Sequence, residues 1–280
     1  MKYIEIKAPA KINIGLKVLS KREDGFHNLS TLFYPINDLY DTLIFEKSNH
    51  FSFLCDAENI PKDDSNLIVK AKNILEIETN KKINVMIKLI KRIPTEAGLG
   101  GGSSDAATTL ISLNEMFSLG LNYEKLITLS LKLGSDVPFF IKPKPSIGKS
   151  RGEILEPIDL EIQEPILIVN PKIKVSTKEA FSEIQPFNSE IDYQSLISNG
   201  KIDYQLLKEK VTNDFEKNIF SHYPEIKNIK NTMLENGALF SLMTGTGSTV
   251  FGIFNNVEEA EKVAQLFPEN YFTFISNYLS

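Results

Sequence analysis

The chain has 280 residues, of which 42% are hydrophobic and 24% are charged, and its formal net charge is −5. These values are typical of a folded protein with one large core or two modest ones, and they exclude the fibrous and disordered classes. A negatively charged chain without a basic tract is not expected to bind nucleic acid or an anionic membrane. Because no apolar run approaches membrane-spanning length and the N-terminus lacks an apolar signal core, we expect a cytoplasmic protein.

Cysteine and histidine usage gives no indication of a metal site. The chain has one cysteine, Cys55, and three histidines, and no metal-ligand spacing relates them. A single cysteine cannot build a disulfide framework, so Cys55 is interpreted as a small buried apolar residue.

The first informative segment is a strand predicted over residues 11–18, where apolar and polar residues alternate. Lys11 and Asn13 are two residues apart, so both project from one face of this strand and address one spot. A lysine that faces solvent from an edge strand is the simpler interpretation, and this segment alone favours it.

A turn over residues 22–27 presents Phe26 and His27 side by side. A single histidine is most often a surface residue or a satisfied core residue, so the turn by itself assigns no function. Further along, a helix is predicted over 67–77 with Asn66 as a candidate start, and alternation predicts a strand over 83–90.

The glycine-rich segment 94–107, PTEAGLGGGSSDAA, lies between this strand and a helical pattern. Four glycines allow a sharp turn with a closely approachable backbone, and a helix start with unpaired amides favours a bound anion. Phosphate is the anion that we expect. No lysine follows the glycines as in a Walker A loop, and the third glycine of a dinucleotide fingerprint is replaced by Ser103. A purely structural turn is the alternative, and the hydroxyl pair Ser103 and Ser104 argues against it.

After a helix predicted over 126–133, Asp136 stands directly before an apolar run. Its carboxylate could have a chemical role or could simply cap the following turn. Residues 142–152 are rich in Pro, Lys and Gly and are interpreted as the joint between two lobes. The predicted domains are therefore 1–150 and 151–280.

The C-terminal part begins with a short strand over 166–169 and a helix that carries Phe181 after a capping-box pattern at Ser176. Its later pattern is helix, strand, strand, helix, strand, and these elements are predicted over 225–235, 238–243, 250–254, 256–267 and 271–275. This is a split-βαβ order, which favours an antiparallel sheet backed by helices.

Three segments together resemble the motifs of the GHMP small-molecule kinases in the right order and spacing. They are PAKINIGLKV at 9–18, the glycine loop at 94–107, and MTGTGSTVFG at 243–252. DGFHNL at 24–29 and GSDVPFF at 134–140 resemble the signatures of the branch that acts on a cytidine-diphosphate-linked sugar alcohol in non-mevalonate isoprenoid synthesis. The resemblance covers nearly the whole chain.

The resemblance implies an α+β, two-lobed GHMP kinase fold, with an N-terminal nucleotide-binding lobe and a C-terminal split-βαβ, ferredoxin-like lobe. It implies phosphorylation of the substrate's 2-hydroxyl by ATP with Mg²⁺, a small-molecule partner, and a monomer or weak homodimer.

Residue roles follow from the same resemblance. Asp136 matches the catalytic base and Lys11 its cationic partner, which would stabilise the developing alkoxide. Asn13 is expected to orient the substrate. Phe26 and Phe181 are expected on the two faces of the cytosine, and His27 at its edge. The expected ATP contacts are Pro94, Glu96, Ala97, Gly98, Leu99, Gly100, Gly101, Gly102, Ser103, Ser104, Asn66, Leu67 and Lys91.

Some positions depart from the family's pattern. Glu96 stands where small residues are common, and an acid beside a phosphate loop is unfavourable unless it points outward. Phe26 replaces the usual Tyr, which keeps the stacking face but loses a hydroxyl. The segment 148–153 is unusually basic, and Lys149 or Arg151 is a candidate diphosphate contact.

Two alternatives stay open. Another GHMP kinase, acting on homoserine, a mevalonate or a sugar, would share the glycine loop and the third motif without needing Phe26 and His27. A non-catalytic nucleotide-binding protein on the same fold is the second alternative, and the joint presence of Lys11 and Asp136 argues against it.

Overall fold

A computed structural model describes residues 3–186 and 189–277. The described residues fall into two compact units that interleave along the sequence. The first contains residues 3–10, 39–93 and 100–143, and the second contains 11–38, 94–99 and 144–277. A single boundary after residue 150 does not describe this arrangement. The reason is that the two long first strands, β1 (Tyr3–Lys21) and β2 (His27–Lys47), each contribute residues to both units.

The first unit combines a small mixed sheet with helices. Strand β4 (Val85–Ile90) pairs in parallel with β3 (Ser52–Cys55) and antiparallel with residues 42–47 of β2. Residues Val85, Ile87 and Leu89 of β4 are buried, as the alternation predicts. The helices are α1 (Leu67–Thr79), α2 (Gly101–Met116), α3 (Tyr123–Leu131) and α4 (Val137–Ile141). Helix α2 packs against the other three, so its N-terminal end has a fixed place in this unit.

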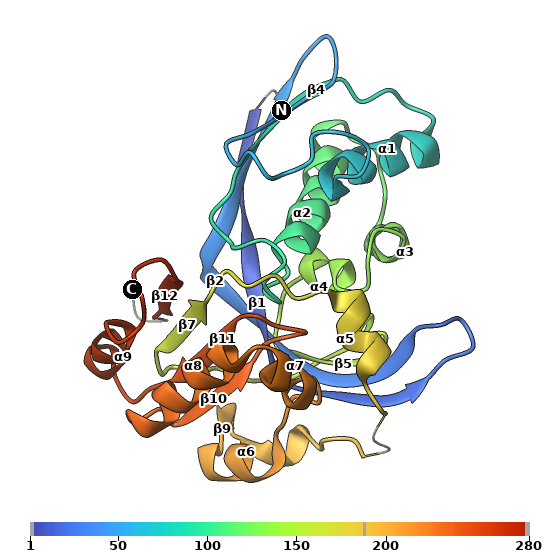
Figure 1. Cartoon of the computed structure of the whole chain (residues 1–280). Helices are drawn as coiled ribbons and strands as arrows, with labels where there is room; N and C mark the ends of the chain where they lie inside the picture. Colours follow the sequence, from blue (N-terminus) through green and yellow to red (C-terminus); the bar gives the residue numbers. More distant parts are fainter. Residues whose placement is uncertain (1–2, 187–188, 278–280) are drawn as a thin grey trace. The chain divides into compact units, whose positions relative to one another are not determined.

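The second unit is organised on a four-stranded antiparallel sheet in the order β10-β11-β7-β12. Its strands are β7 (Ile166–Asn170), β10 (Phe240–Met243), β11 (Val250–Ile253) and β12 (Phe272–Ser276). Helix α8 (Pro224–Glu235) packs against β10 and β11, and α9 (Val257–Ala264) packs against β7 and β12 (Figure 1). The predicted split-βαβ arrangement is confirmed.

Further short elements complete the second unit. They are β5 (Ser146–Ser150), β6 (Ile154–Pro157), α5 (Thr177–Glu183), the 3-10 helix η1 (Gln194–Leu196), β8 (Ile197–Ser198), β9 (Lys201–Ile202), α6 (Tyr204–Lys210) and α7 (Glu216–His222). Strand β5 pairs with residues 29–33 of β2 and with β6, so much of the segment interpreted as a joint is a sheet strand. None of the described helices is both long and apolar enough to cross a bilayer.

Candidate functional site

The first motif lies in β1, and its two polar side chains are buried together. Lys11 is 3% exposed, and its ammonium donates a 2.5 Å hydrogen bond to the Asn13 Oδ1. The Asn13 amide donates in turn to the Thr31 Oγ1 at 2.8 Å. The interpretation of Lys11 as a solvent-facing lysine on an edge strand is therefore wrong. A buried ammonium is costly unless it is paired and hydrogen-bonded, so Lys11 depends on the polar groups around it.

Parts of all three motifs meet around Asn13 in the second unit. The Asn13 N–H donates to the Thr244 Oγ1 of the third motif at 2.9 Å, and the Thr244 hydroxyl lies 3.2 Å from the Gly98 carbonyl oxygen. The Lys11 N–H donates to the Leu99 carbonyl at 3.0 Å. Segments that are more than 80 and more than 140 residues apart in sequence thus form one hydrogen-bonded cluster.

Gly98 is required by this packing. Its φ is +76°, and a Cβ at this position would lie 2.3 Å from the Thr244 carbonyl oxygen. The buried Asn213 also holds the backbone of the third motif. Its amide donates to the carbonyls of Met243 and Gly245 at 2.7 and 2.8 Å. Sequence reasoning missed Asn213, since an Asn in a connecting segment carries no local signal of such a distant contact.

The end of the glycine loop forms the start of α2. Gly100 occupies the N-cap position with φ +72°, and no side chain caps the helix. Gly102 is exposed, and the nearest atom to an added Cβ there would be the Leu67 Cδ1 at 3.9 Å. The Ser104 Oγ is buried and has no hydrogen-bond partner among the described residues. Open backbone at a helix start, with a hydroxyl in the first turn, is the arrangement expected for a phosphate.

Glu96, the acid whose place in the loop was in question, points away from it. Its side chain is 62% exposed and forms a 3.2 Å ion pair with Lys174. Its charge is therefore partly neutralised and largely screened by solvent.

The expected nucleotide residues outside the loop have local partners. Asn66 caps α1 by accepting the Ile68 N–H at 2.8 Å, and its amide donates to the Pro61 carbonyl at 2.7 Å. Lys91 has a side chain that is only 7% exposed, and its ammonium is paired with Asp41 and Asp105. The contacts of Asn66, Leu67 and Lys91 with adenine stay predictions.

The expected cytosine residues lie in the second unit, in one pair of stacked rings and one cation–π pair. The His27 ring stacks on Phe181 with ring centroids 5.2 Å apart and 25° between the planes. Phe26 is 47% exposed, and the Arg151 guanidinium carbon lies 3.7 Å from its ring centroid. Burial foremost, with the nearby Lys21 charge, lowers the pKa of His27, so the imidazole is neutral at pH 7.

Lys149, the other candidate diphosphate contact, forms an exposed ion pair with Glu156 at 2.9 Å. Arg151 instead lies over the Phe26 ring.

Asp136 occupies the N-cap position of α4 in the first unit, and its side chain makes no capping hydrogen bond. The simple capping role is therefore not what the structure shows. Helix α4 is buried and packs against α2 and α3, so the backbone that carries Asp136 is firmly held.

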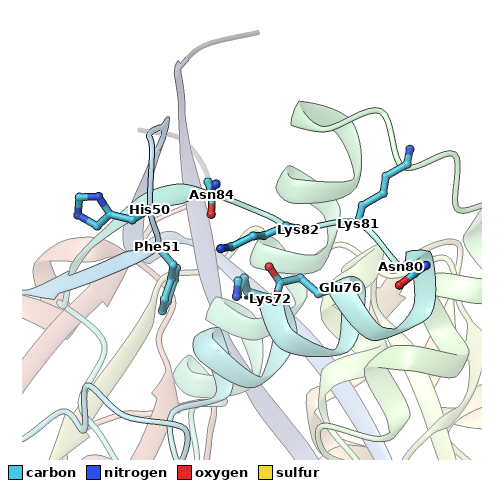
Figure 2. A pocket seen from close by; sticks show the side chains of 8 residues that line it. All are labelled: His50, Phe51, Lys72, Glu76, Asn80, Lys81, Lys82 and Asn84. Atoms are coloured by element: carbon cyan, nitrogen blue, oxygen red, sulfur yellow. Dashed lines mark hydrogen bonds and ion pairs between the residues drawn. The ribbon is translucent and has the colours of Figure 1, made fainter.

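A separate open depression of about 600 Å³ lies in the first unit, beside the C-terminal half of α1 (Figure 2). It is lined by His50, Phe51, Lys72, Glu76, Asn80, Lys81, Lys82 and Asn84. None of the predicted site residues lines it. Its central feature is the 2.7 Å ion pair of Lys72 with Glu76.

The comparisons with known proteins agree with the geometry. Residues 66–143 match the model described as the GHMP kinases N terminal domain, and residues 195–272 match GHMP kinases C terminal. The 4-diphosphocytidyl-2-C-methyl-D-erythritol kinase of Thermoanaerobacter pseudethanolicus is 40% identical over 283 residues, which cover 99% of this chain and 96% of that protein. The chain belongs to the 4-diphosphocytidyl-2-C-methyl-D-erythritol kinase family of GHMP kinases.

Other members of this kinase family match similarly. The Bacteroides fragilis protein of the same name is 41% identical over 259 residues, 91% of this chain and 93% of that protein. A crystal structure of 4-(cytidine 5'-diphospho)-2C-methyl-D-erythritol kinase superposes with a TM-score of 0.81 at 30% identity, over 97% of this chain and 98% of that one. The homoserine kinase from Cytophaga hutchinsonii, at 16% identity and a TM-score of 0.77 over 99% and 95% of the two chains, shares the fold. The predicted fold class is confirmed.

Proposed function

We propose that the protein transfers the γ-phosphate of ATP to the 2-hydroxyl of 4-diphosphocytidyl-2-C-methyl-D-erythritol, in the non-mevalonate route to isoprenoid precursors. The observation that supports this most strongly is the hydrogen-bonded cluster in which Lys11, Asn13, Gly98 and Thr244 bring the three motifs together. The family to which the chain belongs supports the same activity.

Asp136 is proposed as the general base that accepts the proton of the attacking hydroxyl. Phosphoryl transfer requires positioning and charge neutralisation more than covalent chemistry, so one base and a few fixed cations and amides suffice. Lys11 is proposed as the cation that stabilises the alkoxide as its proton leaves. Asn13, which accepts a hydrogen bond from the Lys11 ammonium, would orient that lysine and the substrate together.

The phosphates of ATP are proposed to bind the backbone of Gly100, Gly101 and Gly102 and the hydroxyls of Ser103 and Ser104. The exposed backbone at Gly102 and the unpartnered buried Ser104 hydroxyl support this assignment. The remaining loop residues from Pro94 to Leu99 would position this backbone.

Mg²⁺ would neutralise charge on the transferring phosphates. Among the described residues, no cluster of three His, Cys, Asp or Glu side chains could hold a metal. This fits an ion that is bound mainly through nucleotide phosphates and water, because Mg²⁺ rarely occupies a cage built from protein alone. Ser104 is the hydroxyl that we propose to reach it.

Phe26, His27 and Phe181 are proposed to recognise the cytosine. The neutral His27 ring can both donate and accept at the edge of a base. In the structure His27 lies against Phe181 and Arg151 lies against Phe26, so binding of a base between the aromatic side chains would require these contacts to exchange.

A panel of acceptor alcohols tests the proposal. The expected result is a kcat/KM for 4-diphosphocytidyl-2-C-methyl-D-erythritol that exceeds those for homoserine and mevalonate by at least about 10³, because the aromatic cytosine contacts have no counterpart in the smaller alcohols. Preferred turnover of homoserine or mevalonate would overturn the substrate assignment while leaving the kinase assignment intact.

A further inference from the structure

Asp41 forms hydrogen bonds with the residues between the end of strand β4 and the glycine loop. Its side chain is fully buried, and one carboxylate oxygen accepts the N–H groups of Arg92 and Ile93 at 2.6 and 2.9 Å. The other oxygen accepts a hydrogen bond from the Lys91 ammonium. A single carboxylate thus holds three consecutive residues immediately before Pro94.

The same ammonium also contacts the helix that follows the loop. Its nitrogen lies 3.2 Å from the Asp105 Oδ2 in α2. A Cβ added to Gly101, the first residue of α2, would lie only 2.8 Å from this nitrogen. The start of α2 therefore packs directly on the Lys91 ammonium. Only the loop residues 94–100 separate Ile93 from Gly101 along the chain, so the Lys91 ammonium contacts both ends of the loop.

We propose that Asp41, Lys91 and Asp105 form a buried clamp that fixes the two ends of the glycine loop, and that Lys91 supports ATP binding as a positioning residue. This inference rests on the proposed phosphate-binding role of the loop. It assigns to Asp41 and Asp105 a part in nucleotide affinity, although neither is expected to touch the nucleotide.

The charges of the clamp make each of its members depend on the others. Two carboxylates share one ammonium with almost no access to water, so loss of Lys91 would leave two buried carboxylates without a counter-charge, and loss of Asp41 would remove the carboxylate that joins Lys91 to the backbone before the loop. Burial lowers the pKa of the Lys91 ammonium, but the charges of Asp105 and Asp41 outweigh burial and raise it overall. Lys91 therefore stays charged, and its ammonium is committed to the two carboxylates.

Asp105 is the member of the clamp that titrates near neutral pH. Burial first, and then the charge of Asp41, raise its pKa to about 7 against the opposing effect of Lys91. The charged and titratable groups that face the cluster are Lys91, Asp41, Cys55 and Asp56. Ionisation of Asp105 places a second buried carboxylate charge beside Asp41, and the raised pKa means that the folded site favours the protonated form, so the clamp weakens as the pH rises.

A second carboxylate in the same unit provides a matched control. Glu76 accepts the Lys72 ammonium on one oxygen and the Ile83 N–H on the other, both at 2.7 Å. This is the same chemistry at the start of β4, beside the depression in Figure 2 and at the opposite end of the strand from the loop. Glu76→Gln therefore removes a comparable ion pair without touching the clamp.

The test measures the affinity of a non-hydrolysable ATP analogue by calorimetry for the full chain and for Asp41→Asn, Asp105→Asn and Glu76→Gln. We expect Asp41→Asn to weaken the analogue about tenfold, within the range for residues that act on a site through another. Cytidine diphosphate affinity should stay unchanged, and Glu76→Gln should bind the analogue like the wild type. If Asp41→Asn does not fold, Asp41→Glu tests the same geometry with the charge kept.

The pH dependence of analogue affinity distinguishes a positioning role from a merely structural one, because a merely structural role would not change it. Wild-type affinity for the analogue should decrease between about pH 6 and 8 as Asp105 ionises, and Asp105→Asn should lack the part of this decrease that depends on Asp105. Wild-type affinity in Asp41→Asn, or equal weakening by Glu76→Gln, would overturn the clamp. Because no acceptor alcohol is present, this outcome is separate from a failure of the proposed kinase reaction.

Discussion

At the scale of single residues, the raised pKa of Asp105 predicts how the stability of the fold depends on pH. Its pKa is raised from 3.8 to about 7 in the folded protein, so the folded state binds a proton more tightly than the unfolded chain. The resulting stabilisation is complete below pH 3.8 and is lost as the pH rises through about 7. Urea unfolding of the wild type and of Asp105→Asn across this range should show the wild type losing stability relative to the variant. Parallel curves for the two proteins would contradict the assignment.

Phe181 separates base recognition from core packing. Stacking of a base on an aromatic ring contributes about 1–3 kcal/mol, so Phe181→Ala should weaken cytidine diphosphate by roughly one to two orders of magnitude and leave ATP affinity unchanged. If Phe181 serves only the core, its removal should instead cost stability, up to about 3–5 kcal/mol for a fully buried ring.

The matched control for this variant is Phe220→Ala, because Phe220 is also a partly buried aromatic packed on the same core. Melting temperatures and calorimetric Kd values for both variants distinguish the two roles. A Phe181→Ala protein that melts much lower yet binds cytidine diphosphate normally would remove Phe181 from the site.

Asp136 makes the catalytic prediction. Asp136→Asn keeps the size of the side chain but cannot accept the hydroxyl proton, so kcat should decrease by roughly 10²–10⁴. Affinities for ATP and cytidine diphosphate and the melting temperature should be close to those of the wild type. Near-normal turnover by the folded variant would show that the base lies elsewhere.

The sequence predicted the identity of these residues better than their surroundings. The period-two pattern placed Lys11 and Asn13 on one face, but it also favoured a solvent-facing lysine, because the strand pattern contains no information on Thr31 or Thr244. No sequence pattern around Asp41 indicated its role. Its importance depends on the distant N–H groups that it accepts, and only the fold brings them together.

At the scale of elements, two glycines of the loop should respond oppositely to alanine. At Gly98 the positive φ and the nearby Thr244 carbonyl leave no room for a Cβ, so Gly98→Ala should lower the melting temperature. At Gly102 an added Cβ meets only the Leu67 side chain, at 3.9 Å. Gly102→Ala should keep or raise stability, since Ala favours a helix over Gly by about 1 kcal/mol.

Nucleotide binding completes this comparison. The Gly102→Ala methyl group would lie where the proposed phosphates approach, so we expect a higher KM for ATP in a protein of normal stability. An unchanged KM for ATP would place the phosphates away from the start of α2.

Elements with strong local signals were predicted well, and elements defined by distant contacts were not. Helix α8 and the strands β10 and β11 follow from helical spacing, a stop at Asn236 and Gly237, and short apolar runs. The segment 142–152, which contains strand β5, was interpreted as a joint because it is rich in Pro, Lys and Gly. Strand β5 pairs with the distant residues 29–33 of β2, and the Phe33 ring would lie 2.5 Å from a Cβ at Gly148.

At the scale of the whole molecule, the order of motifs along the chain predicted the family and the fold class, but it did not predict the limits of the compact units. One boundary near residue 150 is the natural expectation when each lobe is assumed to be continuous. The strands β1 and β2 instead contribute to both units, and the glycine loop is divided between them after Leu99. The assignment of ATP to one lobe and the second substrate to the other stays a prediction.

The central claim concerns the whole reaction and is tested most directly by identifying its product. The purified protein is incubated with ATP, Mg²⁺ and 4-diphosphocytidyl-2-C-methyl-D-erythritol, and the product is analysed by ³¹P NMR and mass spectrometry. The account predicts one new phosphate monoester on the 2-hydroxyl, formed in equal amount with ADP and nearly absent with Asp136→Asn. Formation of ADP without a phosphorylated alcohol, or a phosphate on a different hydroxyl, would contradict it.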